Sequence, residues 1–224
     1  MGNIVTSTTA QSHTGQREPL PQWIQKIHMI QEYTTDKFGA ISDGMYEASP
    51  NTVVRSRAGQ FHTDGARWGR GFTSGKHVFT IVFPEELRGT EASVGVGMES
   101  ASLHEKGRIT LVGDNRYSWG IDLRTRRAVH KKKPMKRYPV TQEALPDIFY
   151  MYLNMDSGTL SFASDVGFYG TAFHGLRQCA QPLFPMVSAT VEGAAITMTY
   201  NGSEMDPVTM QQVYGQQSTT VVVQ

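Results

Sequence analysis

The residues that could carry catalysis do not form a recognisable active site. Gly71 to Lys76 resembles a phosphate-binding loop, but Arg70 stands at its first glycine position and His77 replaces the magnesium-binding hydroxyl residue. The segment also leads into a strand-like run, not into the helix that such a loop requires. The seven histidines show no paired ligand spacing, and Cys179 is the single cysteine. We therefore expect a protein that is not an enzyme and binds no metal or cofactor, with His77, His104 and Cys179 as framework residues.

A run of basic residues is the strongest charge feature of the chain. Between Leu123 and Gln142 there are eight Lys or Arg residues and no Asp or Glu. They are Arg124, Arg126, Arg127, Lys131, Lys132, Lys133, Lys136 and Arg137. On a hairpin they would form a positive patch. The patch is either a solvated sheet edge protected from aggregation or a surface for an anionic membrane. Nucleic acid is not expected, because few aromatic residues interleave the run.

The N-terminal residues offer a possible link to that membrane interpretation. Met1 to Thr6 fits the N-myristoylation pattern, with Gly2 as the lipidation candidate. One myristoyl chain binds membranes only marginally, and a polybasic patch supplies the second signal. A membrane-associated adaptor is therefore kept as an alternative, beside the simpler interpretation of an inert tail.

Length and composition indicate one globular domain. The chain has 224 residues, 39% hydrophobic and 18% charged, with a net charge of +1. No apolar run approaches the ~20 residues of a membrane helix, and the polar N-terminus lacks a signal-peptide core. A single cysteine excludes an internal disulfide, which is typical of a reducing compartment. We expect a cytoplasmic location, either free or at a membrane surface.

Residues 148–173 contain the clearest strand pattern. Two runs with alternating apolar residues flank Asp156-Ser157-Gly158, where the glycine suits a tight hairpin turn. Val166 to Gly170 is predicted to be a second turn. Further strands are predicted at residues 52–55, 77–83, 92–98, 116–121, 126–130, 183–189 and 195–200. Many short strands with Gly and Pro between them predict an all-β sandwich of two antiparallel sheets.

The predicted organisation along the chain has four parts. Residues 1–20 are predicted to be a disordered tail, and residues 204–224 a flexible one. Residues 21–50 are predicted to contain a short helix, with loops and short edge strands after it. Trp23, Ile27 and Ile30 recur at helical spacing, and we favour a helix whose Trp23 caps the sandwich over one that binds a partner or a membrane. Residues 51–203 form the predicted main domain.

Several motifs in this domain resemble a known family. Leu-Asn-Met-Asp-x-Gly-Thr-Leu-Ser-Phe at 153–162 is similar to the hairpin signature of SPRY domains. Arg88-Gly89-Thr90, Val94-Gly95-Val96 and Ser118-Trp119-Gly120 follow the order and spacing of the SPRY domain-containing SOCS box (GUSTAVUS-like) group. The resemblance covers roughly Val53 to Tyr200 and implies the same β-sandwich.

The resemblance also implies a binding site for a protein or peptide ligand. In this family, loops at one end of the sandwich hold a short extended peptide with an acidic residue and consecutive asparagines. The positions that correspond to this site are the peptide-binding candidates: Arg55, Arg57, Gly59, Gln60, Gly89, Thr90, Arg108, Thr190 and Val191.

Two of these positions have lost the family's aromatic residues. Arg108 replaces a tyrosine, and Val191 replaces a tryptophan. Aromatic residues often dominate interface energy, so the resemblance implies a retained scaffold with altered specificity. Because Arg55, Arg57 and Arg108 are expected to converge, the predicted ligand is an acidic peptide.

The family's SOCS box has no counterpart in this sequence. The 24 residues after Tyr200 lack its Leu/Cys and Leu-Pro pattern. Elongin B/C is therefore not expected as a partner, and recruitment of a ubiquitin ligase is not expected. A decoy that competes with SOCS-box homologues is a further alternative.

Overall fold

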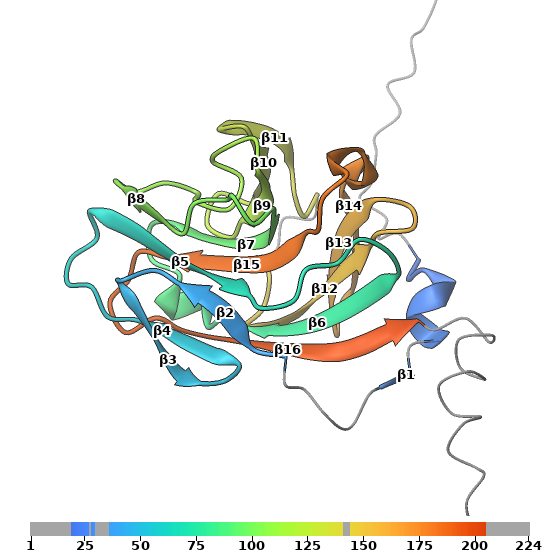
Figure 1. The fold of residues 1–224 in the computed structure, drawn as a ribbon, viewed down its shortest axis with the longest axis horizontal. Coiled ribbons are helices and arrows are strands. Elements are labelled where there is room, and N and C mark those ends of the chain that lie inside the picture. The colour runs from blue at the N-terminus through green and yellow to red at the C-terminus, as the bar shows by residue number, and fades with distance from the viewer. Residues whose placement is uncertain (1–18, 27, 30–35, 141–143, 205–224) are drawn as a thin grey trace, which may run out of the picture.

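The structure, a computed structural model, describes residues 19–26, 28–29, 36–140 and 144–204. These residues form two stacked antiparallel sheets with eight described strands each (Figure 1). The all-β sandwich expected from the alternating pattern is thereby confirmed.

The first sheet contains the central hairpin. Its strands, in spatial order, are β14 (Gly167–Phe173), β13 (Thr159–Ser164), β12 (Ile148–Asn154), β6 (Lys76–Val82), β16 (Ala195–Glu204), β4 (Thr52–Arg55) and β3 (Met45–Ser49), with β1 (His28–Met29) paired to β16.

The second sheet contains the basic run. Its strands, in spatial order, are β11 (Lys133–Arg137), β10 (Arg127–His130), β9 (Ser118–Asp122), β7 (Ala92–Gly97), β15 (Phe184–Ala189), β5 (His62–Trp68) and β2 (Phe38–Ile41), with β8 (His104–Lys106) paired to β5. Three short 3₁₀ turns complete the described structure: η1 (Gln22–Lys26), η2 (Glu85–Leu87) and η3 (Leu176–Cys179).

The core lies between the two sheets. Phe79 and Ile81 of β6 are fully buried and share a cluster with Val94 and Val96 of β7. Alternation in both strands places these side chains on the inner faces. Burying each such side chain contributes about 1.5–3 kcal/mol, so the cluster holds the sheets together and fixes where their connecting loops emerge.

The N-terminal segment differs from its prediction. Among the described residues from Pro21 to Met29, the structure has the 3₁₀ turn η1 and the two residues of β1 in place of an α-helix, while Ile27 and Ile30 lie outside the described residues. Pairing of β1 with the end of β16 draws this segment into the sheet, and short isolated helices are marginal. Trp23 does pack on the sandwich, with its ring 5.8 Å from that of Tyr152 in an edge-on contact. Residues 1–18 and 205–224, including Gly2, lie outside the described residues.

The second predicted turn is also shorter than expected. Ser164 pairs with Gly167, so only Asp165 and Val166 connect β13 to β14. Residues 168–170 belong to β14, where Phe168 and Tyr169 are buried. Contact with the rest of the sheet therefore overrides the turn tendency of the two glycines in this segment.

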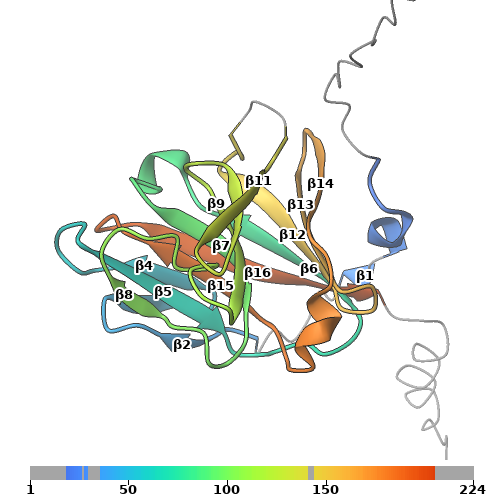
Figure 2. The same ribbon diagram turned by 90° about the horizontal axis from the view of Figure 1, so that it is seen from above.

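The two ends of the sandwich carry different connections. The β4–β5 connection and β8 lie at the left of Figures 1 and 2, and β1 and η1 lie at the right. The connections β4–β5, β6–β7 and β15–β16 all emerge at the left end, as the antiparallel strand order requires. This end contains the predicted peptide-binding positions.

Candidate peptide-recognition site

Four loops with predicted peptide-binding residues meet at this end. A Cβ atom on Gly89 would lie 2.1 Å from Val191 Cγ2, so these two loops touch. Gly193 N–H donates to the Arg55 carbonyl at 2.8 Å. Arg108 Nε–H donates to the Gln60 carbonyl at 3.2 Å. The structure thus brings together positions that are up to 136 residues apart in the sequence (55 to 191).

Arg55 lies in the interior, not on the surface of this end. Its side chain is 0% exposed, and its Nε lies 3.2 Å from Asp64 Oδ2. Its Nη1–H and Nη2–H groups donate to the carbonyls of Arg57 at 2.7 Å and His62 at 3.0 Å. Arg55 therefore holds both ends of the β4–β5 loop from beneath.

Arg57 and Arg55 both contact one carboxylate of the same chain. Arg57 Nε–H donates to Asp64 Oδ2 at 3.0 Å, and Asp64 is completely buried. Ser42 Oγ–H also donates to Asp64, at 3.1 Å. Two of the three arginines expected to attract an acidic ligand therefore share one carboxylate of this chain.

Arg108 is different from these two arginines. It is exposed on the loop after β8. Among the described residues, no carboxylate oxygen lies within ion-pair distance of its guanidinium group. Of the three arginines, it alone has no carboxylate partner among the described residues.

The β15–β16 connection does not supply an exposed anchor. Thr190 is fully buried and its hydroxyl donates to the Glu91 carbonyl at 3.1 Å. Val191, in the place of the family's tryptophan, is half-buried and packs against the core cluster. Thr90, beside them, is exposed. The surface here is therefore flatter than one with a tryptophan would be.

Phe61 is a residue of this site that the sequence pattern did not reveal. Its side chain is 74% exposed, more than any other large hydrophobic residue described. The Arg108 guanidinium lies 5.4 Å from its ring centroid. The available signal was its position directly after Gln60, where an apolar residue interrupts a polar loop.

A hollow joins this site to the basic hairpin. It has a volume of about 430 Å³. Its lining residues are Glu91, Arg108, Ile109, Thr110, Asp114, Asp122, Thr125, Arg127, Val129, Lys132 and Pro134. Burial, together with the nearby Asp122 carboxylate, raises the pKa of Glu91. The loops with predicted peptide-binding residues and the basic run therefore border the same hollow, although they are far apart in the sequence.

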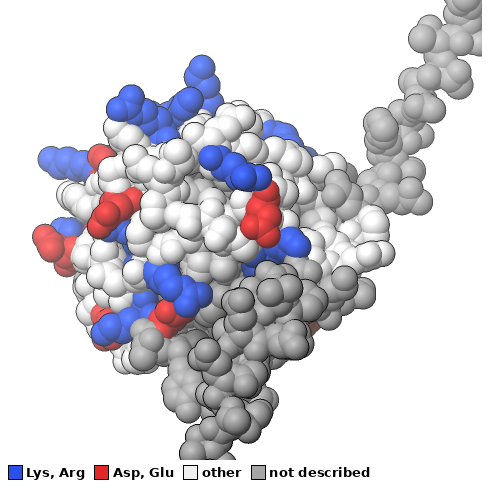
Figure 3. Space-filling model, turned by 45° about the vertical axis from the view of Figure 1, so that its right-hand side comes forward, with Lys and Arg blue, Asp and Glu red and all other residues white. Residues whose placement is uncertain are grey.

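The basic run forms the hairpin of β10 and β11 at the edge of the second sheet. All five residues of β11 are exposed. Arg127 lies opposite Arg137, so two like charges face each other across the strands. His130 lies opposite Lys133. Lys132 pairs with Asp114 at 3.5 Å, and Lys136 donates to the Thr171 carbonyl. In Figure 3 the uppermost side chains are Lys and Arg without acidic residues among them, at the height where Figure 1 places β11.

Two histidines stack beside the recognition loops. His62 Nδ1 and His104 Nε2 are 3.0 Å apart, which requires that one nitrogen carries a proton and the other does not. Burial, Arg57 and His104 lower the pKa of His62. The pair reinforces the contact between β5 and β8, which supports the framework role expected for His104.

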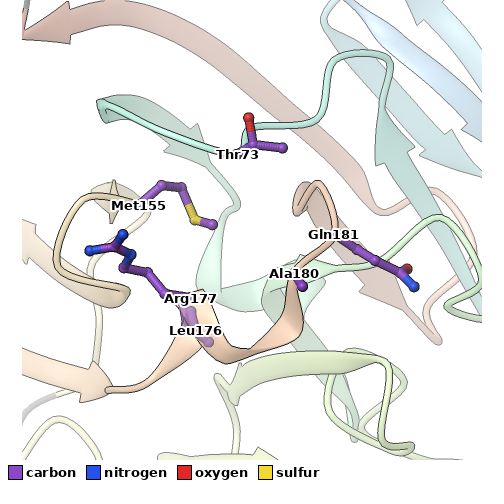
Figure 4. A pocket seen from close by; sticks show the side chains of 6 residues that line it. All are labelled: Thr73, Met155, Leu176, Arg177, Ala180 and Gln181. Atoms are coloured by element: carbon purple, nitrogen blue, oxygen red, sulfur yellow. The ribbon is translucent and has the colours of Figure 1, made fainter.

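The opposite end has a smaller hollow without catalytic groups in its lining (Figure 4). It has a volume of about 260 Å³ and is lined by Thr73, Met155, Leu176, Arg177, Ala180 and Gln181. The loop at 71–75 beside it continues into strand β6 and not into a helix. Burial raises the pKa of the nearby Cys179 thiol, which reduces its reactivity.

The described residues hold neither a metal-binding cluster nor a membrane-spanning helix. In the described ranges, no three or more His, Cys, Asp or Glu side chains are grouped in a way that could hold a metal ion. Within the same ranges, no helix has the length and apolar character needed to cross a membrane.

Comparisons with known proteins agree with the fold and the motifs. The family model of the SPRY domain matches residues 76–203. The chain is 43% identical over 154 residues to the human SPRY domain-containing SOCS box protein 1, covering 65% of this chain and 56% of that protein. It is 42% identical over 152 residues to Protein gustavus of Drosophila melanogaster, covering 65% of this chain and 53% of that protein. The chain thus spans about half the length of these relatives.

Solved structures give the same fold. The TRIM65 PSpry domain superimposes with a TM-score of 0.57 at 18% identity, covering 88% of this chain and 99% of that one. The SPRY domain of human HERC1 superimposes with a TM-score of 0.54 at 16% identity, covering 72% of this chain and 98% of that one. With a family model that matches more than half of its residues, and with the sandwich described above, this chain belongs to the SPRY domain family.

Proposed function

We propose that this protein binds a short segment of a partner protein through the loops at the β4–β5 end of the sandwich. SPRY domains are protein-interaction modules. The observation that carries the proposal is the meeting of the loops of Arg55, Gly89, Arg108 and Val191 at one end. The relation to the SPRY domain-containing SOCS box proteins supports the same end, because the candidate positions come from that resemblance.

The proposed specificity differs from that of the family. The two family aromatic positions carry Arg108, which is exposed, and Val191, which packs on the core. Losing one aromatic hot spot typically costs about 2 kcal/mol or more, roughly a thirtyfold loss of affinity. An Asp-Ile-Asn-Asn-Asn peptide should therefore bind weakly, and calorimetric titration of the full chain tests this. Micromolar or tighter binding would contradict the altered specificity.

Selection from a phage-displayed library of random 12-residue peptides tests binding itself. Full-length protein should recover a recurrent motif. A Thr90→Arg variant should lose it, because Thr90 is exposed between the meeting loops and the larger side chain would obstruct them. A Val166→Ser variant, changed at an exposed residue on the β13–β14 turn, is the matched control and should keep the motif. Failure of the wild-type protein to recover any motif would contradict the proposed binding of a partner segment.

A second candidate function is attachment to an anionic membrane surface through the basic hairpin. The pairing of Arg127 with Arg137 favours it, since like charges directly opposite each other are destabilising and an anionic surface would relieve the repulsion. Each surface Lys or Arg adds about 1 kcal/mol on an anionic leaflet. The acylation candidate Gly2 lies outside the described residues.

Vesicle sedimentation tests this second candidate. The N-myristoylated full chain should sediment with phosphatidylserine vesicles in a salt-sensitive way. Gly2→Ala and a triple change of Lys131, Lys132 and Lys133 to Glu should each reduce sedimentation. Equal sedimentation of the charge-reversed protein would exclude the hairpin as the attachment surface.

The expectation that elongin B/C is not recruited rests on residues 201–224, of which 205–224 lie outside the described residues. It stays a prediction, as does the decoy alternative. Pull-down of elongin B/C by the full-length chain would contradict the expectation that elongin B/C is not recruited.

A further inference from the structure

We infer that Phe61 and Arg108 together form one anchor, which binds an apolar residue and an acidic residue placed two positions apart in the partner segment. This inference rests on the proposed function and specifies its ligand. Neither residue is an anchor that the family resemblance supplies: Phe61 is not among the matched positions, and Arg108 replaces a tyrosine.

The first observation is exposed aromatic surface at the place where it is needed. Phe61 is 74% exposed, whereas most large apolar side chains of this protein are buried. Aromatic side chains provide a large, stiff contact area at a low cost in conformational entropy. Phe61 lies on a different loop from the two lost family aromatics, so the site regains aromatic area from the β4–β5 connection.

The second observation is an unmatched charge directly beside this ring. Arg108 lies 5.4 Å from the ring centroid and uses Nε–H for the Gln60 carbonyl. No described residue accepts from its two Nη groups. A guanidinium fork is suited to bidentate binding of a carboxylate. Since Arg55 and Arg57 both already contact Asp64, Arg108 is the arginine of the three without a described carboxylate partner, and a ligand carboxylate would be attracted to it.

The third observation is that the backbone that carries the pair is held in place before a ligand arrives. Gly107 N–H donates to the Phe61 carbonyl at 2.7 Å, and Thr63 Oγ1–H donates to the Gly107 carbonyl at 2.9 Å. Arg55 holds both ends of the Phe61 loop from beneath. Such preorganisation lowers the entropy lost on binding, so an exposed pair of this kind suits recognition.

The distance between the two groups limits the spacing in the ligand. Neighbouring side chains of an extended segment point to opposite faces, so the nearest side chains on one face are two positions apart, about 6.6 Å along the segment. The 5.4 Å between the Arg108 guanidinium and the Phe61 ring is close to this spacing. One extended segment can therefore place a carboxylate on Arg108 and an apolar side chain on Phe61 at the same time.

The same phage library, selected with full-length variants, tests the inference. Wild-type protein should enrich peptides with Asp or Glu two positions away from Leu, Ile, Met or Phe. A Phe61→Ser variant should lose the apolar preference and keep the acidic one, and an Arg108→Gln variant should do the reverse. Arg116→Gln is the matched control, because Arg116 is also exposed and also lies over an aromatic ring, 4.8 Å from that of Tyr117. It should select the wild-type motif.

Affinities of one wild-type-selected peptide then separate the two contributions. Phe61→Ser and Arg108→Gln should each weaken binding about tenfold or more. The double variant should lose less than the product of the single losses, because the two side chains touch. Thermal unfolding of each variant shows whether the fold is kept, which the exposure of both residues predicts.

Each outcome of the selection is informative. An identical motif from wild type, Phe61→Ser and Arg108→Gln overturns the anchor and leaves the proposed function standing. A wild-type motif without an acidic and an apolar residue two positions apart also overturns the anchor. Absence of any recurrent wild-type motif overturns the proposed function and the anchor with it.

Discussion

At the scale of single residues, the buried Asp64 carboxylate connects side chains at the β4–β5 end of the sandwich. It lies between Arg55 and Arg57, and Arg55 holds the Phe61 loop. Asp64→Asn would leave the buried Arg55 charge without a counter-ion. Removing one partner of a buried ion pair typically destabilises by about 3–5 kcal/mol, and we expect a loss of this size in urea unfolding.

Two controls separate this effect from a general effect of charge removal. Arg57→Gln should cost less than Asp64→Asn, because Arg57 is partly exposed and Asp64 keeps Arg55 as its partner. Glu47→Gln, which breaks the exposed Lys37 pair at 3.9 Å, should have almost no effect. Equal losses for Asp64→Asn and Glu47→Gln would show that the buried network does not stabilise the fold.

His77 makes stability depend on pH. Its Nε2–H donates to the Ser74 carbonyl at 2.8 Å, and its Nδ1 accepts from the Tyr200 hydroxyl at 3.1 Å. Burial lowers the pKa of His77 to about 4, with opposition from the Ser74 hydrogen bond. The unfolded chain, with an ordinary histidine pKa, binds this proton more readily. Stability should therefore fall as the pH decreases from about 6.5 toward 4.

The measurable quantity is the free energy of unfolding at pH 7.5 and 4.5. Wild type should lose about 2.5 kcal/mol more than His77→Gln between these values. The exposed His174→Gln variant should follow the wild type. A His77→Gln protein with the same pH dependence as wild type would contradict the assignment.

At the scale of elements, β7 and β9 approach so closely that one glycine has no substitute. A Cβ atom on Gly95 would lie 2.0 Å from the Trp119 carbonyl oxygen. Gly95→Ala would push the strands apart, and overpacking of this kind costs about 1–3 kcal/mol. Gly193→Ala, where nothing lies within 4 Å, is the comparison in urea unfolding. It carries only the cost of its positive φ and should lose less; a larger loss would contradict the close-approach explanation.

In the β10–β11 hairpin, the strand register places two like charges opposite each other. Arg127 and Arg137 face each other at the sheet edge. Arg137→Glu would turn the repulsion into attraction and should stabilise by about 0.2–1 kcal/mol, measured by thermal unfolding at low salt. The gain should shrink at high salt because exposed charges are screened. Arg137→Gln, which removes the repulsion without adding attraction, should give a smaller gain.

At the scale of the whole molecule, the sandwich begins before residue 51. β2 and β3 lie in the two sheets, and Phe38 and Met45 are buried in the shared core. Phe38 packs edge-on against Trp68 with the ring centroids 5.3 Å apart. A chain that starts at residue 36 should therefore keep cooperative unfolding, and one that starts at residue 51 should not. Tryptophan fluorescence during urea unfolding distinguishes them, and cooperative unfolding of the shorter chain would show that β2 and β3 are dispensable.

Much of the architecture follows from the sequence because strand alternation and turn glycines act locally. The β6 and β12 patterns and the turn at Gly158, with φ of 69°, are present as predicted. The SPRY motifs are short contiguous stretches, so the linear sequence was enough to identify the family. The helix expected from Pro21 onward is reduced to a 3₁₀ turn in its described part, and the long turn expected at 166–170 was wrong, because pairing with other strands decided those segments.

Tertiary structure decided which side chains at the β4–β5 end of the sandwich are paired and which are exposed. The sequence alone suggested Arg55, Arg57 and Arg108 as ligand contacts, but could not show that the first two would share the buried Asp64 carboxylate. It also passed over Phe61, whose exposure depends on how the β4–β5 loop and the β8 loop pack. Local pattern determines which segments become strands. Whether a side chain meets water or a counter-ion depends on residues that only the folded chain brings within reach.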